Sequence, residues 1–115
     1  MSKNKLADLS TDFAVAILKL TSSLKEHPAL VSQLERSATS IGASIREANY
    51  AHNRADFIFT LQTALKACFE TEYWLELMQR TELLPYEASK SYLHECGSIR
   101  RMLIASINTA KENSH

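Results

Sequence analysis

The stretch Ser37-Ala38-Thr39-Ser40-Ile41-Gly42-Ala43-Ser44-Ile45 carries no formal charge and no long polar side chain over nine consecutive residues. It lies in a range, about 29–51, whose apolar positions recur at steps of four and three: Leu34, Ala38, Ile41, Ile45 and Ala48. These steps place the apolar side chains on one face of a helix, as in bundle packing. A helix with one face in water normally has Lys or Glu there, so we expect this helix to be covered on more than one side.

Three further ranges show helical spacing of apolar residues, at about 4–25, 54–80 and 85–111. Pro28, the capping pattern that begins at Asn53, and Pro85 separate them. These residues end or begin helices because proline restrains its neighbours and Asn caps a helix N-terminus. Short connections force neighbouring helices to run antiparallel. The sequence therefore predicts an all-α fold: a single domain over 1–115, folded as an antiparallel up-down-up-down four-helix bundle.

The charge balance and the uncharged runs exclude several classes of protein. Thirteen Lys and Arg match thirteen Asp and Glu, so the cationic excess typical of nucleic-acid binding is absent. The longest uncharged runs are nine residues, against about 20 needed to span a bilayer. We expect a cytoplasmic protein that does not enter membranes. Cys68 and Cys96 lie in separate helical ranges, where we expect reduced, buried thiols.

No pattern of residues indicates catalysis. Bundles that hold two metal ions need Glu-x-x-His pairs on two helices, and the one such pair here, Glu112 with His115, lies at the chain end. The chain also has no nucleophile elbow, and both glycines are isolated inside helical ranges, so no phosphate-binding loop is present. We expect no catalytic, cofactor-binding or metal-binding residues, and a protein that is not an enzyme.

The range 54–80 is apolar nearly all round, and together with 29–51 it exceeds what a monomer of this size is expected to bury. We therefore expect a homo-oligomer. The interface predicted from the two helices consists of Arg36, Ser37, Ser40, Ala43, Ser44, Glu70, Tyr73, Trp74 and Leu77. For the charged residues two alternatives stay open. They form a solvated face with weak ion pairs, or Arg36 or Arg46 pairs with carboxylates of 54–80 across helices or subunits.

A weaker pattern concerns nucleic acid. Tyr50, His52 and Arg54 form the one cluster in which an aromatic ring lies close to basic groups. The basic residues that could form an RNA-binding surface, if an oligomer repeated them around its axis, are Arg46, Arg54, Arg100 and Arg101.

The run from Gln33 to Ala48, with Ala55-Asp56-Phe57-Ile58, Ala64-Leu65-Lys66 and the run from Glu70 to Leu77, resembles a known bacterial family. This is the four-helix-bundle family first associated with intervening sequences in large-subunit ribosomal RNA genes. The similarity extends from Asn4, Ser10 and Phe13 to the terminal Ile107-Asn108-Thr109-Ala110-Lys111. One departure is Arg46-Glu47-Ala48, where some members have Ala-Glu-Gly.

The resemblance implies a small cytoplasmic bundle that assembles as a homopentamer, most of whose relatives have no established molecular role. A distantly similar branch serves diversity-generating retroelements by binding reverse transcriptase and RNA, but this chain lacks that branch's strong positive charge. Our first hypothesis is a non-enzymatic, homo-oligomeric scaffold or adaptor whose partner is itself. The alternative is an RNA-binding accessory factor, whose partner is RNA or a nucleic-acid-processing protein.

Overall fold

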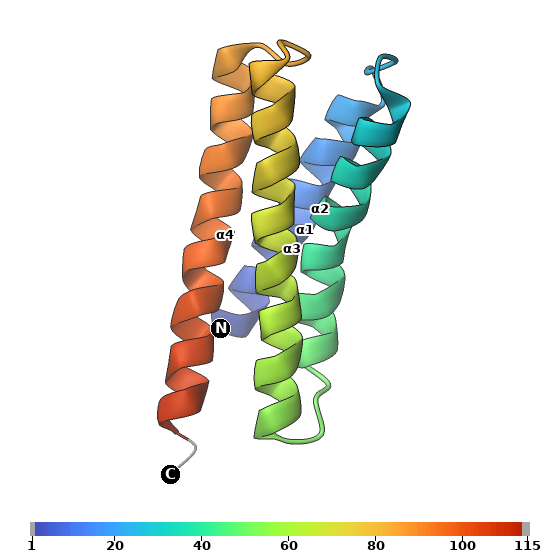
Figure 1. Ribbon diagram of the computed structural model, residues 1–115. Helices are drawn as coiled ribbons and strands as arrows, with labels where there is room; N and C mark the ends of the chain where they lie inside the picture. Colours follow the sequence, from blue (N-terminus) through green and yellow to red (C-terminus); the bar gives the residue numbers. More distant parts are fainter. Residues whose placement is uncertain (1, 114–115) are drawn as a thin grey trace.

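The computed structural model describes residues 2–113, and the side chains of residues 5–113. These residues form four helices, α1 (Ser2–Thr21), α2 (Pro28–Ala48), α3 (Arg54–Arg80) and α4 (Tyr86–Glu112), with no strand among them. Successive helices run in opposite directions (Figure 1), so the predicted antiparallel up-down-up-down bundle is confirmed. The bundle is elongated, with Cα extents of 49 × 21 × 20 Å.

The connection between α1 and α2 begins earlier than the expected end at residue 25. The hydroxyl and the N–H of Ser23 both donate to the carbonyl oxygen of Leu20, at 2.9 and 3.3 Å, and so close the last turn. Serine side chains often compete in this way for helix carbonyl groups. His27 then adopts a left-handed conformation (φ 52°), and Pro28 begins α2 in the first turn, where its missing N–H costs nothing.

The other two connections are closed by local hydrogen bonds. The side chain of Asn53 caps α3 as predicted and accepts a hydrogen bond from the Asp56 N–H at 2.8 Å. The Asp56 carboxylate accepts in turn from the N–H of His52, at 3.3 Å, one residue before the cap. Between α3 and α4, Glu82 is left-handed (φ 62°) and the Leu84 N–H donates to the Met78 carbonyl oxygen at 3.2 Å.

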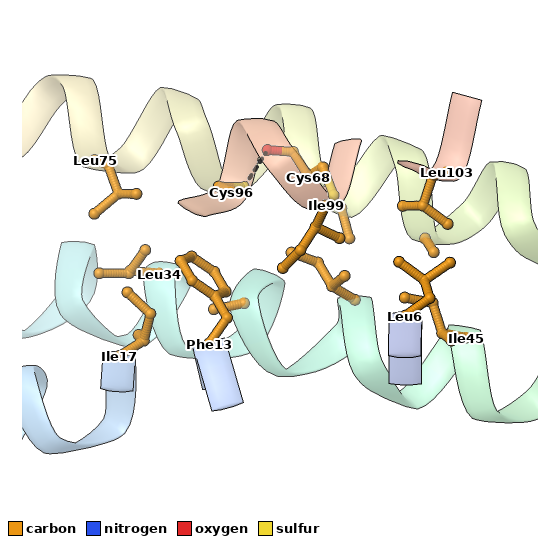
Figure 2. Packing of buried hydrophobic residues seen from close by; sticks show 14 of the residues in the cluster. Leu6, Phe13, Ile17, Leu34, Ile45, Cys68, Leu75, Cys96, Ile99 and Leu103 are labelled. Atoms are coloured by element: carbon orange, nitrogen blue, oxygen red, sulfur yellow. Dashed lines mark hydrogen bonds between the residues drawn. The ribbon is translucent and has the colours of Figure 1, made fainter. Parts of the chain in front are cut away.

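The hydrophobic core lies along the axis of the bundle, and α2 packs on both α1 and α3. Figure 2 shows Leu34 and Phe13 meeting Leu75 and Ile99 across the core. Every buried side-chain nitrogen and oxygen among the described residues has a hydrogen-bond partner. The uncharged stretch of α2 is therefore covered on two sides within one chain. Its buried residues are Ser37, Ala38, Ile41, Gly42, Ser44 and Ile45.

Gly42 lets α1 approach α2 closely. A Cβ atom built at Gly42 would lie 3.3 Å from the Ser10 hydroxyl oxygen and 3.7 Å from the Ser10 backbone carbon. Ser10 is fully buried, and its hydroxyl already donates to the carbonyl oxygen of Ala7 at 2.9 Å. An added methyl group would therefore push on this hydroxyl, which must shift by a few tenths of an ångström against its hydrogen bond.

Gly97 on α4 offers the matched comparison. A Cβ atom there would lie 3.3 and 3.4 Å from the guanidinium ends of Arg101 and Arg100, which are flexible side chains. We expect Gly42→Ala to lower the free energy of unfolding by about 1–3 kcal/mol through overpacking. Gly97→Ala should raise it by about 0.5 kcal/mol because alanine favours helix. Urea unfolding followed by circular dichroism measures both, and equal stability of the two variants would contradict this account of α1–α2 packing.

Candidate interaction surface

Arg36 on α2 and Glu70 on α3 form an ion pair across the outer seam of these helices. The arginine also donates to the side-chain oxygen of Gln33 at 2.9 Å. Glu70 accepts a second hydrogen bond, from the Trp74 indole N–H at 3.3 Å. Of the two alternatives left open by the sequence, pairing of Arg36 across helices is therefore present within one chain. Both side chains are partly exposed, so the pair contributes less than about 1 kcal/mol to stability.

Three aromatic side chains lie exposed along the outside of α3. Phe59, Phe69 and Tyr73 are 67%, 52% and 53% exposed, and we call them the α3 aromatic face. The Tyr73 ring lies 5.0 Å from the Trp74 ring, centroid to centroid, so this face continues into the Arg36–Glu70 ion pair. Exposed apolar side chains on the outside of one helix are candidates for an interaction site.

The residues predicted to form the interface differ in their exposure within one chain. Arg36, Glu70, Tyr73 and Trp74 are brought together by the contacts described above. Ala43 is exposed, whereas Ser40 and Leu77 are partly buried. These residues are all available to a second molecule.

Ser37 and Ser44, which the sequence placed in the interface, are buried inside the chain, so little of either side chain is exposed to a second copy. The Ser37 hydroxyl lies 2.9 Å from the hydroxyl of Thr71, between α2 and α3. The small side chain at Ser37 allows α3 to approach α2 here, a role that the sequence analysis had given to a neighbouring subunit.

The sequence also missed Phe59 and Phe69 as surface residues. The seven-residue spacing in the sequence could have identified part of this surface. The buried positions Leu61, Cys68 and Leu75 recur every seven residues and mark the core side of α3. Phe59 and Tyr73, together with Lys66, recur at the same interval on a different side of the helix.

The four arginines proposed to contact nucleic acid do not gather into one patch. Arg46 donates to the Thr11 hydroxyl at 3.1 Å and Arg54 to the carbonyl oxygen of Asn113, at the end of α4. Arg100 and Arg101 both lie beside Gly97.

Arg100 is also neutralised by a carboxylate. Its Nε donates to Glu72 at 3.1 Å, and its guanidinium lies 5.9 Å from the centre of the Phe69 ring. Tyr50 is 84% exposed in the connection between α2 and α3, close in sequence to Arg54.

The two cysteines face each other between α3 and α4, both free and fully buried. The Cys96 thiol donates to the backbone oxygen of Cys68 at 3.6 Å (Figure 2). A hydrogen bond with the Cys68 side chain, together with burial, raises the pKa of the Cys96 thiol far above its usual range. Cys96 is therefore a neutral thiol, the opposite of the low-pKa thiolate that nucleophilic catalysis requires.

Within the part of the chain that the structure describes, no group of three or more His, Cys, Asp or Glu side chains could hold a metal ion. His27 and His52 lie in different connections, and His94 lies on α4. No helix among the described residues is long and apolar enough to cross a membrane. The pair Glu112 and His115 falls partly outside the described residues.

The fold and the surface define a small four-helix-bundle protein whose distinctive groups lie on the outside of α2 and α3. Residues 2–105 match the model of the 23S rRNA-intervening sequence protein family, and the chain belongs to this family. The resemblance seen in the sequence is thereby confirmed.

The chain is also similar to a solved crystal structure from Bacteroides thetaiotaomicron VPI-5482, described as a protein of unknown function from the S23 ribosomal protein family. The two are 44% identical and superpose with a TM-score of 0.89, and the match covers 94% of this chain and 99% of that one. No curated protein shows significant similarity to this chain.

The buried pair Ser37 and Thr71 tests the packing of α2 on α3. Ser37→Ala and Thr71→Val should each lower the free energy of unfolding by about 1 kcal/mol, because each removes the hydrogen bond between the two hydroxyls. The hydroxyl that remains keeps its own bond to a helix carbonyl oxygen, that of Leu34 for Ser37 and that of Ala67 for Thr71. The double variant should lose at least about 0.5 kcal/mol less than the two single losses added together. Urea unfolding of the four proteins completes the cycle, and strictly additive losses would mean that the hydroxyls do not interact.

The Cys96 thiol predicts a pH dependence. Its pKa is raised in the folded chain, so above about pH 8.5 the unfolded chain releases this proton while the folded chain keeps it. Stability should therefore fall above that pH, with a contribution of up to about 1.4 kcal/mol per pH unit. Thermal unfolding between about pH 7.5 and pH 9.5 measures it. The control is Cys96→Ala, which should remove most of the slope; an unchanged slope would contradict the assignment to Cys96.

Proposed function

We propose that this protein is a non-enzymatic scaffold or adaptor that assembles as a homo-oligomer through the outer surface of α2 and α3. The observation that carries the proposal is the α3 aromatic face, defined above as Phe59, Phe69 and Tyr73. Each of these rings leaves half or more of its surface in water. Covering one such ring is favourable by about 2 kcal/mol, because aromatic side chains bury large apolar areas.

The residues beside this face suit contact with another protein. Ala43 and Ser40 are small, so a neighbouring helix could approach α2 closely at these positions. The ion pair between Arg36 and Glu70 lies next to Trp74 and would fix the position of the neighbour by charge. Ion pairs at the rim of an interface contribute to orientation more than to affinity.

A second apolar patch favours a ring over a simple dimer. Val15 and Leu18 on α1 are 45% and 44% exposed. Among the described residues α1 packs on α2 and α4 but not on α3, so α1 and α3 are diagonal in the bundle and their outer sides face away from each other. Two different patches on opposite sides suit a head-to-tail contact, which closes into rings. We propose that the α3 aromatic face of one chain packs on Val15 and Leu18 of the next.

The subunit number comes from the family resemblance, which implies five chains. A closed ring of this kind would present the ends of the helices on its two rims, where a further partner could bind. This arrangement makes the chain an adaptor, and it requires no reaction at any of its residues.

A second candidate function is RNA binding by the oligomer. Among the described residues no carboxylate lies within ion-pair distance of Arg46, Arg54 or Arg101. A ring would repeat these three charges on every chain, although the protomer has no net charge. Retention of a labelled RNA that weakens steeply with salt, and is lost on Arg101→Ala, would support this role, whereas no retention at low salt would remove it.

The assembly is tested by the mass in solution, measured by light scattering after size exclusion. The wild-type protein should show a mass near five times the 13.0 kDa protomer. Ala43→Glu and Leu18→Lys should each shift the mass to that of one chain, because each places a charge in an apolar contact while leaving the protomer core untouched. Ser91→Glu, on an exposed part of α4, is the matched control and should keep the wild-type mass. A wild-type monomer, or an Ala43→Glu protein of native mass, would overturn the proposed interface.

A further inference from the structure

An open groove lies at the end of the bundle where α2 leads into α3. Its volume is about 650 Å³. Figure 1 shows that α1 begins partway along α4, so the last turns of α4 have no α1 beside them. The described lining residues come from all four helices and the α2–α3 connection: Leu6, Ile45, Ala48, Asn49, Ala51, Asn53, Arg54, Phe57, Leu61, Ala105, Ser106, Thr109, Ala110 and Asn113.

The floor of the groove is apolar. Leu6 and Ile45, which lie next to each other in Figure 2, belong to the core, and Leu61 continues this surface on α3. Phe57 is only partly buried and adds one exposed edge of an aromatic ring. An apolar body placed here would gain contact with the core without displacing a polar partner.

The rim of the groove is polar, and its formal charge is positive. Arg54 is the one charged residue in the described lining, and no carboxylate belongs to that lining. Its guanidinium donates to the carbonyl oxygen of Asn113, which holds it at the rim between α3 and α4. The side chains of Asn49 and Asn53 add amide groups on the same rim, and the Asn53 amide nitrogen is free to donate because its oxygen accepts from Asp56.

We propose that this groove binds a small anionic amphiphile, whose carboxylate contacts Arg54 and whose apolar body lies on Leu6, Ile45 and Phe57. Charge complementarity selects the sign of the head group. A guanidinium binds a carboxylate through charge-assisted hydrogen bonds, and no nearby acid in the described lining competes.

The size of the groove selects a small molecule over a helix of another protein. A volume of about 650 Å³ lies within the range of small-molecule sites, roughly 300–1,000 Å³. A helix with its side chains is about 10–12 Å across and would need a groove open along several turns. Figure 1 shows only the last turns of α4 extending beyond the start of α1, so the uncovered part of α4 is short.

This site is separate from the proposed self-association. No member of the α3 aromatic face lines the groove, and neither do Arg36, Glu70 or Trp74. Loss of ligand binding and loss of assembly are therefore measured independently.

Decanoate is the first probe, used below its critical micelle concentration in isothermal titration calorimetry. Decanol and decyltrimethylammonium are the matched probes, with the same apolar chain and a neutral or cationic head. We expect decanoate to bind about tenfold more tightly than decanol, and decyltrimethylammonium to bind more weakly than either.

Three variants locate the site. Arg54→Gln should weaken decanoate binding about tenfold and leave decanol binding unchanged. Ser106→Phe should abolish binding of both probes because the ring fills the groove. Arg101→Gln removes a guanidinium outside the described lining and should bind both as the wild type does. If Arg54→Gln does not fold, Arg54→Lys keeps the charge and should retain the preference for decanoate over decanol.

Several results would overturn the proposal. They are no binding of decanoate to the wild-type protein at millimolar concentration, equal losses in Arg54→Gln and Arg101→Gln, or tight binding of decyltrimethylammonium. Unchanged binding in Ser106→Phe would place the probe elsewhere, as on the α3 aromatic face, and would equally overturn it.

Discussion

The packing of α2 between α1 and α3 is the constraint on which the rest of this structure depends. Gly42 admits Ser10 of α1 on one side, and Ser37 meets Thr71 of α3 on the other. Both contacts need small side chains, because dense packing leaves no room for added methyl groups. With α2 held on two sides, large apolar side chains remain exposed on the outside of α3 and α1, and others remain exposed on α4 and in the α2–α3 connection.

The contrast between buried and exposed side chains separates residues that serve packing from residues that are candidates for function. The buried residues of α2 and α3 serve packing, as do the buried thiols of Cys68 and Cys96 between α3 and α4. The ion pair of Arg36 with Glu70 and the exposed aromatic rings contribute little to the stability of a single chain. The aromatic rings leave apolar area exposed to water, which is unfavourable, and this is the physical reason to propose that another copy of the chain covers them.

The sequence predicted the class of the fold and the rough extent of the helices, because both follow from apolar spacing, the prolines and the cap at Asn53. It also predicted that the stretch from Ser37 to Ile45 is covered on more than one side. It assigned part of that cover to a second molecule, whereas the chain itself buries Ser37 and Ser44, because helical spacing does not reveal which neighbour lies on each side. The groove beside Arg54 was out of reach for the same reason, because it depends on where α1 begins relative to α4.

Trp74 offers the most direct measurement of the central claim that a second copy covers the outside of α2 and α3. It is the one tryptophan in the chain and lies partly exposed between Tyr73 and Glu70. Acrylamide quenching of its fluorescence should be compared in the wild-type protein and in a variant that is monomeric by mass. The account predicts weaker quenching in the wild type, where a neighbouring chain shields the indole. Equal quenching in the two proteins would contradict it.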